Sequence, residues 1–152
     1  MRFMMLMIPK VYQPDTPPAE RADEAFAPPA EAVAKMTKYN EELAKAGMLI
    51  SLEGLHPATR GVRVEFSRGM AEVIDGPYPA AKEVVGGYWI IEAKSKEEAV
   101  AWARRCPAAD GDVIEVRQVF DMSDFPPEVR KAAESPAVRA RIEHRPEARR
   151  PH

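Results

Sequence analysis

The sequence predicts an α+β protein on the ferredoxin-like plan, with the element order β-α-β, a hairpin, and β-α-β. Three observations predict this class. Residues 2–8 are apolar on both parities, as in a strand covered on both faces. Helical periodicity follows the first strand and precedes the last one. Between the two β-α-β units, alternating apolar and charged residues precede Ser67-Arg68-Gly69, which has the composition of a hairpin connection.

Length and composition describe an ordinary globular chain. A chain of 152 residues usually forms one domain with a real core. The net charge of −2 argues against a nucleic-acid binder, which would need a basic face. One cysteine, Cys106, excludes an internal disulfide, and three scattered histidines make no zinc set, so we expect no metal and no cofactor.

From the apolar runs of the sequence we expect neither a membrane helix nor a signal peptide. No apolar run approaches the roughly 20 residues of a membrane helix. The opening run is stopped by Pro9 and Lys10, too early for a signal peptide, so we expect a cytoplasmic protein. Prolines crowd residues 14–29 and the C-terminal end. We therefore expect a domain over residues 1–120 and an arm over 121–152.

The first β-α-β unit begins with the strand 2–8, which ends at Pro9. An acidic stretch, residues 15–31, is expected as a surface loop. From Pro29 to Ala46 the pattern becomes helical, and Gly47 supplies a left-handed stop. The residues expected on the buried face of this helix are Val33, Met36, Asn40, Leu43 and Ala44. Residues 48–53 then form a strand.

The predicted hairpin occupies residues 62–74. Val62, Val64 and Phe66 alternate with charged residues, which predicts a half-buried strand. Residues 67–69 form a three-residue connection with glycine last, as a bulged hairpin prefers. Residues 70–74 are the return strand.

The second β-α-β unit starts with a strand at residues 88–92. Residues 95–98 have the spacing of a capping box. The helix that follows is expected to end at Pro107. Its apolar side consists of Ala99, Trp102, Ala103 and Cys106. Residues 113–119 form the last strand. Two helices cover only one face of such a sheet, so we expect a partner chain on the other face, a homodimer being the simplest arrangement.

Residues 75–89 form the densest patch of unusual side chains. Two prolines stiffen the loop, and paired glycines allow close backbone packing. One interpretation is a preformed site mouth, to which Asp75, Tyr78 and Lys82 contribute. The other is a structural turn, in which Asp75 accepts local backbone hydrogen bonds and Lys82 pairs with Glu83 at the surface.

This patch, DGPYPAAKEVVGGYWIIE, resembles the DGPF-type motif of YCII-related proteins, with Tyr78 where phenylalanine is usual. The segments AGMLISLEGLHP and EEAVAWARRCPAADGDVIEVRQV are also similar to that family, so the resemblance covers roughly residues 1–120. It implies a dimeric α+β barrel of ferredoxin-like protomers.

The resemblance also implies where chemistry would occur. Classical YCII proteins carry a presumed His–Asp pair, on the first helix and just after the second. Here Met36 or Thr37 stands near the first position, and Cys106-Pro107 near the second. A YCII-like dehydrochlorinase implies that the fold can host lyase chemistry. The frequent proximity of DGPF-type genes to sigma-factor genes implies a role in transcriptional regulation.

Other residues offer replacement chemistry. Asp75 is the best acid–base candidate, and His56 at a strand end would make a dyad with it, although a histidine beside Pro57 also suits a solvated loop. Glu115 and Arg117 share a strand face away from the helices, either as a ligand anchor or as an interface pair.

Two further residues stay open between function and packing. Tyr88 joins the ligand-lining set or packs. Cys106 is expected to be a small buried hydrophobe, because a nucleophile needs a base or an electropositive neighbour.

Two functions remain. The first is a cytoplasmic homodimer that binds or transforms a small polar or aromatic molecule by acid–base elimination or isomerisation. The second is a non-catalytic interaction module with a regulatory protein partner. The tail 135–152 is basic, and Val138 and Ile142 suit a short docking helix.

Overall fold

The computed structural model describes residues 1–78 and 80–143, and the chain divides into two compact units, Met1–Val119 and Phe120–His152. The second unit contains α3 (Pro127–Ala133) and α4 (Pro136–Glu143). The rest of the basic tail, residues 144–152, lies outside the described residues. The helices and strands of the first unit are β1 (Arg2–Ile8), α1 (Ala30–Lys45), β2 (Leu49–Gly54), β3 (Val62–Ser67), β4 (Met70–Asp75), β5 (Gly87–Glu92), α2 (Lys96–Ala103) and β6 (Val113–Gln118).

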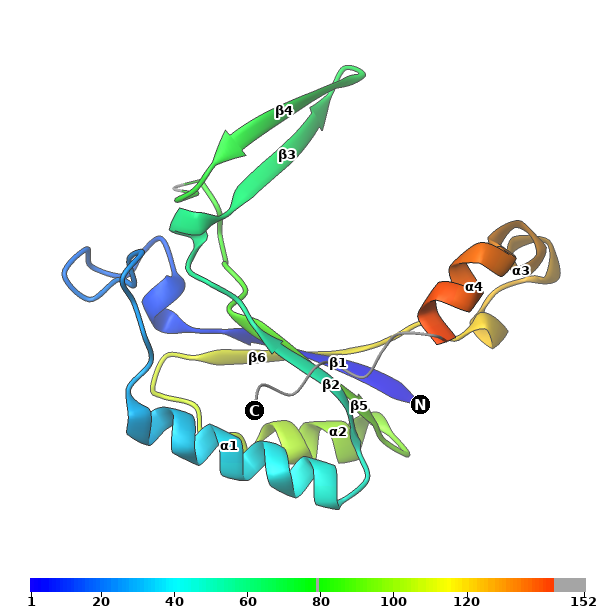
Figure 1. Ribbon diagram of the computed structural model, residues 1–152, viewed down its shortest axis with the longest axis horizontal. Coiled ribbons are helices and arrows are strands. Elements are labelled where there is room, and N and C mark those ends of the chain that lie inside the picture. The colour runs from blue at the N-terminus through cyan, green and yellow to red at the C-terminus, as the bar shows by residue number, and fades with distance from the viewer. Residues whose placement is uncertain (79, 144–152) are drawn as a thin grey trace. The chain divides into compact units, whose positions relative to one another are not determined.

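A four-stranded antiparallel sheet in the order β2-β5-β1-β6 forms the body of the first unit (Figure 1). The central strand β1 pairs with β5 on one side and with β6 on the other, and Met5 lies opposite both Trp89 and Val116. This confirms the α+β class. The strand order is compatible with the ferredoxin-like plan.

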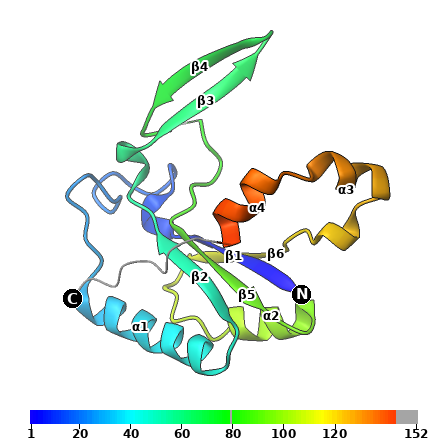
Figure 2. The same ribbon diagram turned by 45° about the vertical axis from the view of Figure 1, so that its right-hand side comes forward.

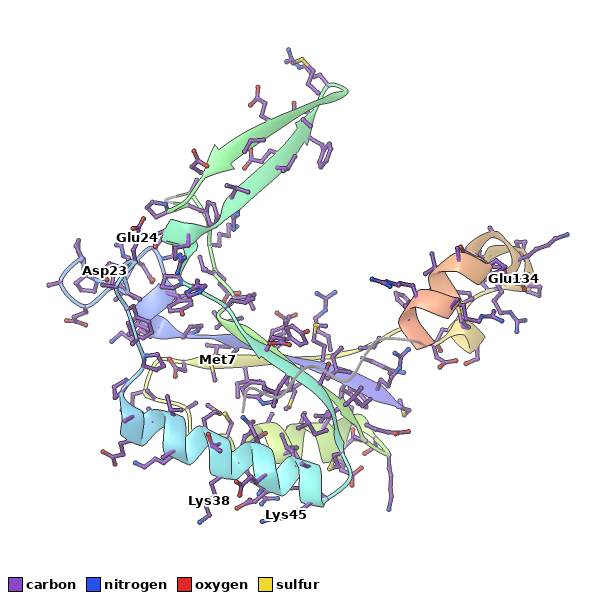
Figure 3. The ribbon with its side chains drawn as sticks, viewed as in Figure 1. Met7, Asp23, Glu24, Lys38, Lys45 and Glu134 are labelled. Atoms are coloured by element: carbon purple, nitrogen blue, oxygen red, sulfur yellow. The ribbon has the colours of Figure 1, made fainter. Side chains whose placement is uncertain are left out.

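Both helices lie on the same side of this sheet in two views (Figures 1 and 2). The hydrophobic core fills the space between the two helices and the sheet. Its buried members are Phe3, Met5, Tyr39, Leu43, Met48, Trp89, Ile91, Ala93 and Ala99. Lys38 and Lys45 project from the opposite side of α1, away from the sheet (Figure 3). The buried apolar side chains of α1 therefore face the sheet and these lysines face away from it, as expected of an amphipathic helix.

Aromatic rings anchor α1 to the sheet and to α2. Tyr39 makes an edge contact with Trp89, their ring centroids 6.1 Å apart, and its hydroxyl donates to the Trp102 carbonyl. The Trp89 indole N–H donates to the side chain of Asn40 at 2.8 Å. Burial raises the pKa of Tyr39, because water no longer stabilises the phenolate. These bonds let polar atoms enter the core.

The buried stripe of α1 differs from the predicted one. Val33 is 46% exposed and Ala44 is also exposed, whereas Tyr39 is buried. The stripe that meets the sheet runs only from Met36 to Leu43, at helical spacing. Gly47 does end the helix, with a φ of 71°, and the Met48 amide donates back to the Leu43 carbonyl.

Two details of α2 also differ from the prediction. The helix ends at Ala103, with Arg104 as its last capping residue, and turns rather than helix lead to Pro107. Ser95 accepts from the Glu98 amide as a capping residue does, but the Glu98 carboxylate accepts from the Lys94 amide instead of the Ser95 amide.

The hairpin β3–β4 is a separate two-stranded sheet. Ser67 pairs with Met70, so the connection has two residues, not the three predicted. Arg68 and Gly69 both have a positive φ, 51° and 77°, as the two-residue turn that matches strand twist requires. Residues 62–67 do form a strand, but the prediction that it is half-buried is wrong, since Val62, Val64 and Phe66 are 58%, 49% and 83% exposed.

No helix within residues 1–78 and 80–143 is both long and apolar enough to cross a membrane.

Candidate functional site

Three loops build a site at the end of the sheet where β1 and β2 finish and β5 begins. They are residues 9–13, 55–61 and 76–86. The Gly86 amide donates to the Met7 carbonyl at 2.8 Å, and the Gly86 carbonyl accepts from the Leu55 amide at 2.9 Å. Tyr12 adds a bond from its hydroxyl to the Leu55 carbonyl. Backbone bonds at the strand ends thus fix where the loops start.

Gln13 locks the loop 76–86 to the loop 9–13. Its amide nitrogen donates to the Pro9 and Val84 carbonyls at 2.6 and 2.9 Å, and its oxygen accepts from the Val84 amide at 2.8 Å. The side chain is 9% exposed. A buried amide with these three bonds behaves like a short piece of strand pairing, so Val84 has one position relative to β1.

The start of the DGPY segment packs directly on the turn that follows β2. The Gly76 amide donates to the Gly61 carbonyl at 2.9 Å, and the Gly76–Pro77 bond is cis. A Cβ at Gly76 would lie only 1.6 Å from the Ala58 carbonyl oxygen. Glycine is therefore required by contact between two backbones.

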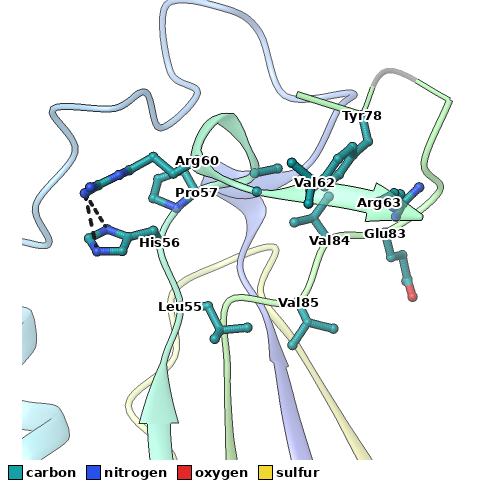
Figure 4. Close-up of a pocket in the computed structure, with 12 residues that line it drawn as sticks. Leu55, His56, Pro57, Arg60, Val62, Arg63, Tyr78, Glu83, Val84 and Val85 are labelled. Carbon is teal, nitrogen blue, oxygen red and sulfur yellow. Dashed lines mark hydrogen bonds between the residues drawn. The ribbon is translucent and has the colours of Figure 1, made fainter. Parts of the chain in front are cut away.

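A cavity of about 470 Å³ opens beside these loops (Figure 4). Both ring nitrogens of His56 lie 3.4–3.5 Å from Nη1 of Arg60. The guanidinium of Arg63 lies 4.4 Å above the Tyr78 ring centroid. The lining residues are Leu55, His56, Pro57, Ala58, Arg60, Gly61, Val62, Arg63, Tyr78, Glu83, Val84 and Val85. Two arginines against one glutamate, Glu83, leave this wall with a net positive charge.

A second cavity, of about 550 Å³, shares the segment 55–57 with the first as part of its wall. Its wall is mainly apolar and comes from the N-terminal loop, α1, the end of β2 and the segment after α2. Asp112 ties two of these parts together, because its carboxylate accepts from the Lys10 and Ala109 amides, each at 2.9 Å. His56 lines both cavities.

Met36 and Cys106 meet at the edge of this second cavity. Their sulfur atoms are 3.9 Å apart, Met36 lines the cavity, and so does Pro107. The resemblance locates the presumed acid–base pair near these two places, at Met36 or Thr37 and at Cys106-Pro107. Burial raises the pKa of Cys106 to about 11, with Asp112 adding to the shift. The thiol is therefore neutral at pH 7, and this contact offers no proton acceptor.

The predicted site residues fall into separate groups. His56 and Tyr78 line the cavity of Figure 4. Asp75 ends β4, where it pairs with Val62. Between His56 and Asp75 no hydrogen bond occurs in the described part of the chain; His56 contacts Arg60 instead. The dyad stays a prediction.

The other predicted residues lie elsewhere. Lys82 is exposed in the loop 76–86. Glu115 and Arg117 form an ion pair at 3.6 Å on β6, with side chains 45% and 70% exposed. Tyr88 lies on β5 opposite Leu6. Phe3 and Met5 face the helices, so Met4 and Leu6, which alternate with them along β1, face the other side of the sheet. Arg117 pairs with Met4, and Glu115 and Tyr88 pair with Leu6. These three residues therefore lie on the sheet face opposite the helices.

Sequence reasoning missed Gln13, Arg60 and Arg63. A single glutamine in a proline-rich stretch has no periodic signal, and its partner Val84 is 71 positions away. Arg60 stands four residues after His56 in a 3₁₀ turn, a spacing that could have suggested the contact. Arg63 was assigned only to strand alternation.

The fold and the site together define an α+β protein with a loop-built cavity at one end of an antiparallel sheet. A family model, the YCII-related domain, matches residues 1–123. The chain belongs to the YCII-related family. It is also 30% identical, over 69 residues, to an uncharacterized protein of Rhizobium meliloti (strain 1021); the match covers 45% of this chain and 56% of that protein.

The backbone contact at Gly76 gives a direct test of the site architecture. We expect Gly76→Ala to lower the free energy of unfolding by at least ~2 kcal/mol in urea denaturation, because the loop must move away from Ala58. Gly54→Ala is the control, since nothing lies within 4 Å of its added Cβ. Equal stability of the two variants would mean that the two loops do not pack as described.

Proposed function

We propose that this chain binds a small aromatic or otherwise apolar molecule that carries an anionic group, and transforms it by acid–base chemistry of the lyase or isomerase kind. The observation that carries the proposal is that His56 lines both cavities. An apolar body would occupy the larger cavity, and the anionic group would face His56 and Arg60. The volume of about 550 Å³ lies within the range of small-molecule sites.

Arginine chemistry supports the anionic part of this ligand. A guanidinium presents several N–H donors in one plane and pairs well with a carboxylate. Arg60 is exposed, and its guanidinium contacts only the His56 ring among the interactions found in the described residues. An incoming carboxylate could therefore contact both side chains without breaking a buried ion pair.

Acid–base chemistry in this site would depend on His56. Imidazole is the most frequent general acid or base at neutral pH. In the proposed reaction His56 takes a proton from the bound molecule, and Asp75 is the second acid–base candidate. Tyr78 and Lys82 are proposed to contact the ligand from the loop 76–86.

The alternative is a non-catalytic interaction module linked to transcriptional regulation. One observation favours it: Met36 and Cys106 occupy the places of the presumed acid–base pair and contact each other through sulfur. The raised pKa of Cys106 leaves this pair without a base. In this function the cavities would bind a ligand without turning it over.

Ligand binding is tested with 4-fluorobenzoate and its neutral amide by ¹⁹F NMR titration. We expect the carboxylate to bind about tenfold more tightly than the amide, as a charge-assisted hydrogen bond provides. Arg60→Gln should remove this preference, and His56→Gln should weaken binding of the carboxylate. Arg130→Gln, in the second unit, is the matched control.

Each result assigns a function. No binding of either probe, or a carboxylate preference that survives Arg60→Gln, would contradict the proposed site. Turnover of a bound molecule that is identified by native mass spectrometry, and lost in His56→Gln, supports an enzyme. Binding without turnover supports the interaction module.

We also propose that the chain forms a homodimer through the sheet face opposite the helices, giving a dimeric α+β barrel of ferredoxin-like protomers. Met4 and Leu6 of β1 lie beside Ile90 and Tyr88 of β5 on that face, and all four are only half-buried within one chain. Two stacked faces would cover this apolar centre. Glu115, Arg117 and Tyr88 would then line the space between the sheets.

The homodimer is tested by native mass spectrometry and light scattering of Ile90→Lys. We expect loss of the sheet-face dimer with retained circular dichroism, because the lysine points away from the helical core. Val100→Lys, at an exposed position of α2, should leave the mass unchanged. If Ile90→Lys still had the mass of a dimer, this sheet face would not be the interface.

A further inference from the structure

Within the described residues of the first unit, the hairpin β3–β4 exposes an apolar face. Val62, Val64 and Phe66 share one face with Val73 of the return strand, which is 68% exposed. An isolated two-stranded hairpin is marginally stable in water. Figure 1 shows the hairpin extending away from the four-stranded sheet, with which it forms no strand pairs. A further strand on its edge would stabilise it.

The outer edge of β3 is open to such a strand. Within the described residues β3 pairs with β4 alone, without a bulge. The two-residue turn closes on Ser67 and Met70, so the antiparallel pairs alternate from there. By this alternation Val62, Val64 and Phe66 direct their backbone N–H and C=O groups away from β4, towards an incoming strand.

The sequence of β3 is complementary to itself about Val64. When a second copy runs antiparallel with Val64 opposite Val64, Arg63 faces the Glu65 of the other copy, and Val62 faces its Phe66. Both charged pairs are of opposite sign and both apolar pairs match. We propose that β3 pairs with β3 of a second copy in this register, forming a four-stranded sheet from two hairpins.

The charges of the hairpin favour this register. Glu65 lies opposite Glu72 within the hairpin, an unfavourable pair of like charges. An arginine from the second copy on the other side of Glu65 would compensate it. Arg63 is already stacked on Tyr78, and a stacked guanidinium keeps its N–H donors available in its own plane.

The edge of β4 does not offer the same match. A symmetric pairing about Glu72 would bring two glutamates together. Pairing about Val73 would place Glu72 opposite Ile74 and Ala71 opposite Asp75. The charge complementarity is thus specific to β3, and the occupant it fits is another copy of this chain.

Pairing at β3 would also reach the cavity of Figure 4. Val62 and Arg63 line that cavity, and the second copy would place Phe66 beside Val62. The effect on ligand binding rests on the proposed function, whereas the pairing itself does not.

Cross-linking tests the register. In a Cys106→Ala background, Val64→Cys should cross-link to its copy with a short bis-maleimide, because paired residues lie about 5.5 Å apart. Val73→Cys is the control; it is more exposed than Val64, but the two copies would lie about 14 Å apart across three strand spacings. Equal cross-linking at both positions would overturn the proposal.

Charge reversal supplies a second, independent test. With the Val64→Cys reporter, Glu65→Arg or Arg63→Glu alone should reduce cross-linking about tenfold, since each places like charges opposite each other twice. A mixture of the two variants should restore it, because the opposing pairs are then complementary. The pairing would be refuted if neither substitution lowered the yield of cross-linked dimer, or if mixing the two variants did not restore that yield.

The design separates this interface from the sheet-face dimer and from misfolding. Glu65→Arg gains an opposite charge across from Glu72, so its hairpin should be at least as stable as the wild type. Melting temperatures verify this. Ile90→Lys with the Val64→Cys reporter removes the sheet-face contact alone, and cross-linking should persist; its loss there would show that the hairpins do not pair by themselves.

Discussion

The side-chain amide of Gln13 holds together the loops on which the candidate site is built. Its three hydrogen bonds join Pro9, just after β1, to Val84, which lines the cavity of Figure 4. The two bonds to Val84 are buried, so removing the amide would leave the Val84 backbone groups without partners and cost about 1–3 kcal/mol. The position of Val84 between the two backbone-anchored ends of its loop, and with it part of the cavity wall, depends on this residue.

The rest of the site uses the sheet as a rigid support. β1 and β2 end beside the start of β5, and the Gly86 backbone bonds to the ends of both. His56 and Tyr78 are carried by loops on this support, an arrangement typical of functional residues. Met36 and Cys106, whose sulfur atoms contact each other, stand near the places that the family resemblance indicates, and neither is a histidine or an aspartate.

Local patterns in the sequence predicted the fold better than the site. Apolar runs, capping residues and Gly47 act over a few residues, and they located the sheet and both helices. Alternation in β3 predicted a strand correctly but not its exposure, because a period of two does not say what covers the face. The short turn was missed because Arg68 takes a left-handed conformation, which is uncommon for arginine. His56 was singled out by its place at a strand end, and Tyr78 by the dense patch 75–89, but the link from Gln13 to Val84 joins distant positions and leaves no local pattern.

Hydrogen exchange on Gln13→Leu, compared with the wild type, tests the central claim most directly. We expect the amides of Val84 and Gly86 to lose protection while those of β1 and Trp89 keep it, since the core does not depend on this side chain. Gln13→Glu should lie between, because its carboxylate still accepts from the Val84 amide. Unchanged protection of Val84 in Gln13→Leu would contradict the account, because the loop would then be held by other contacts.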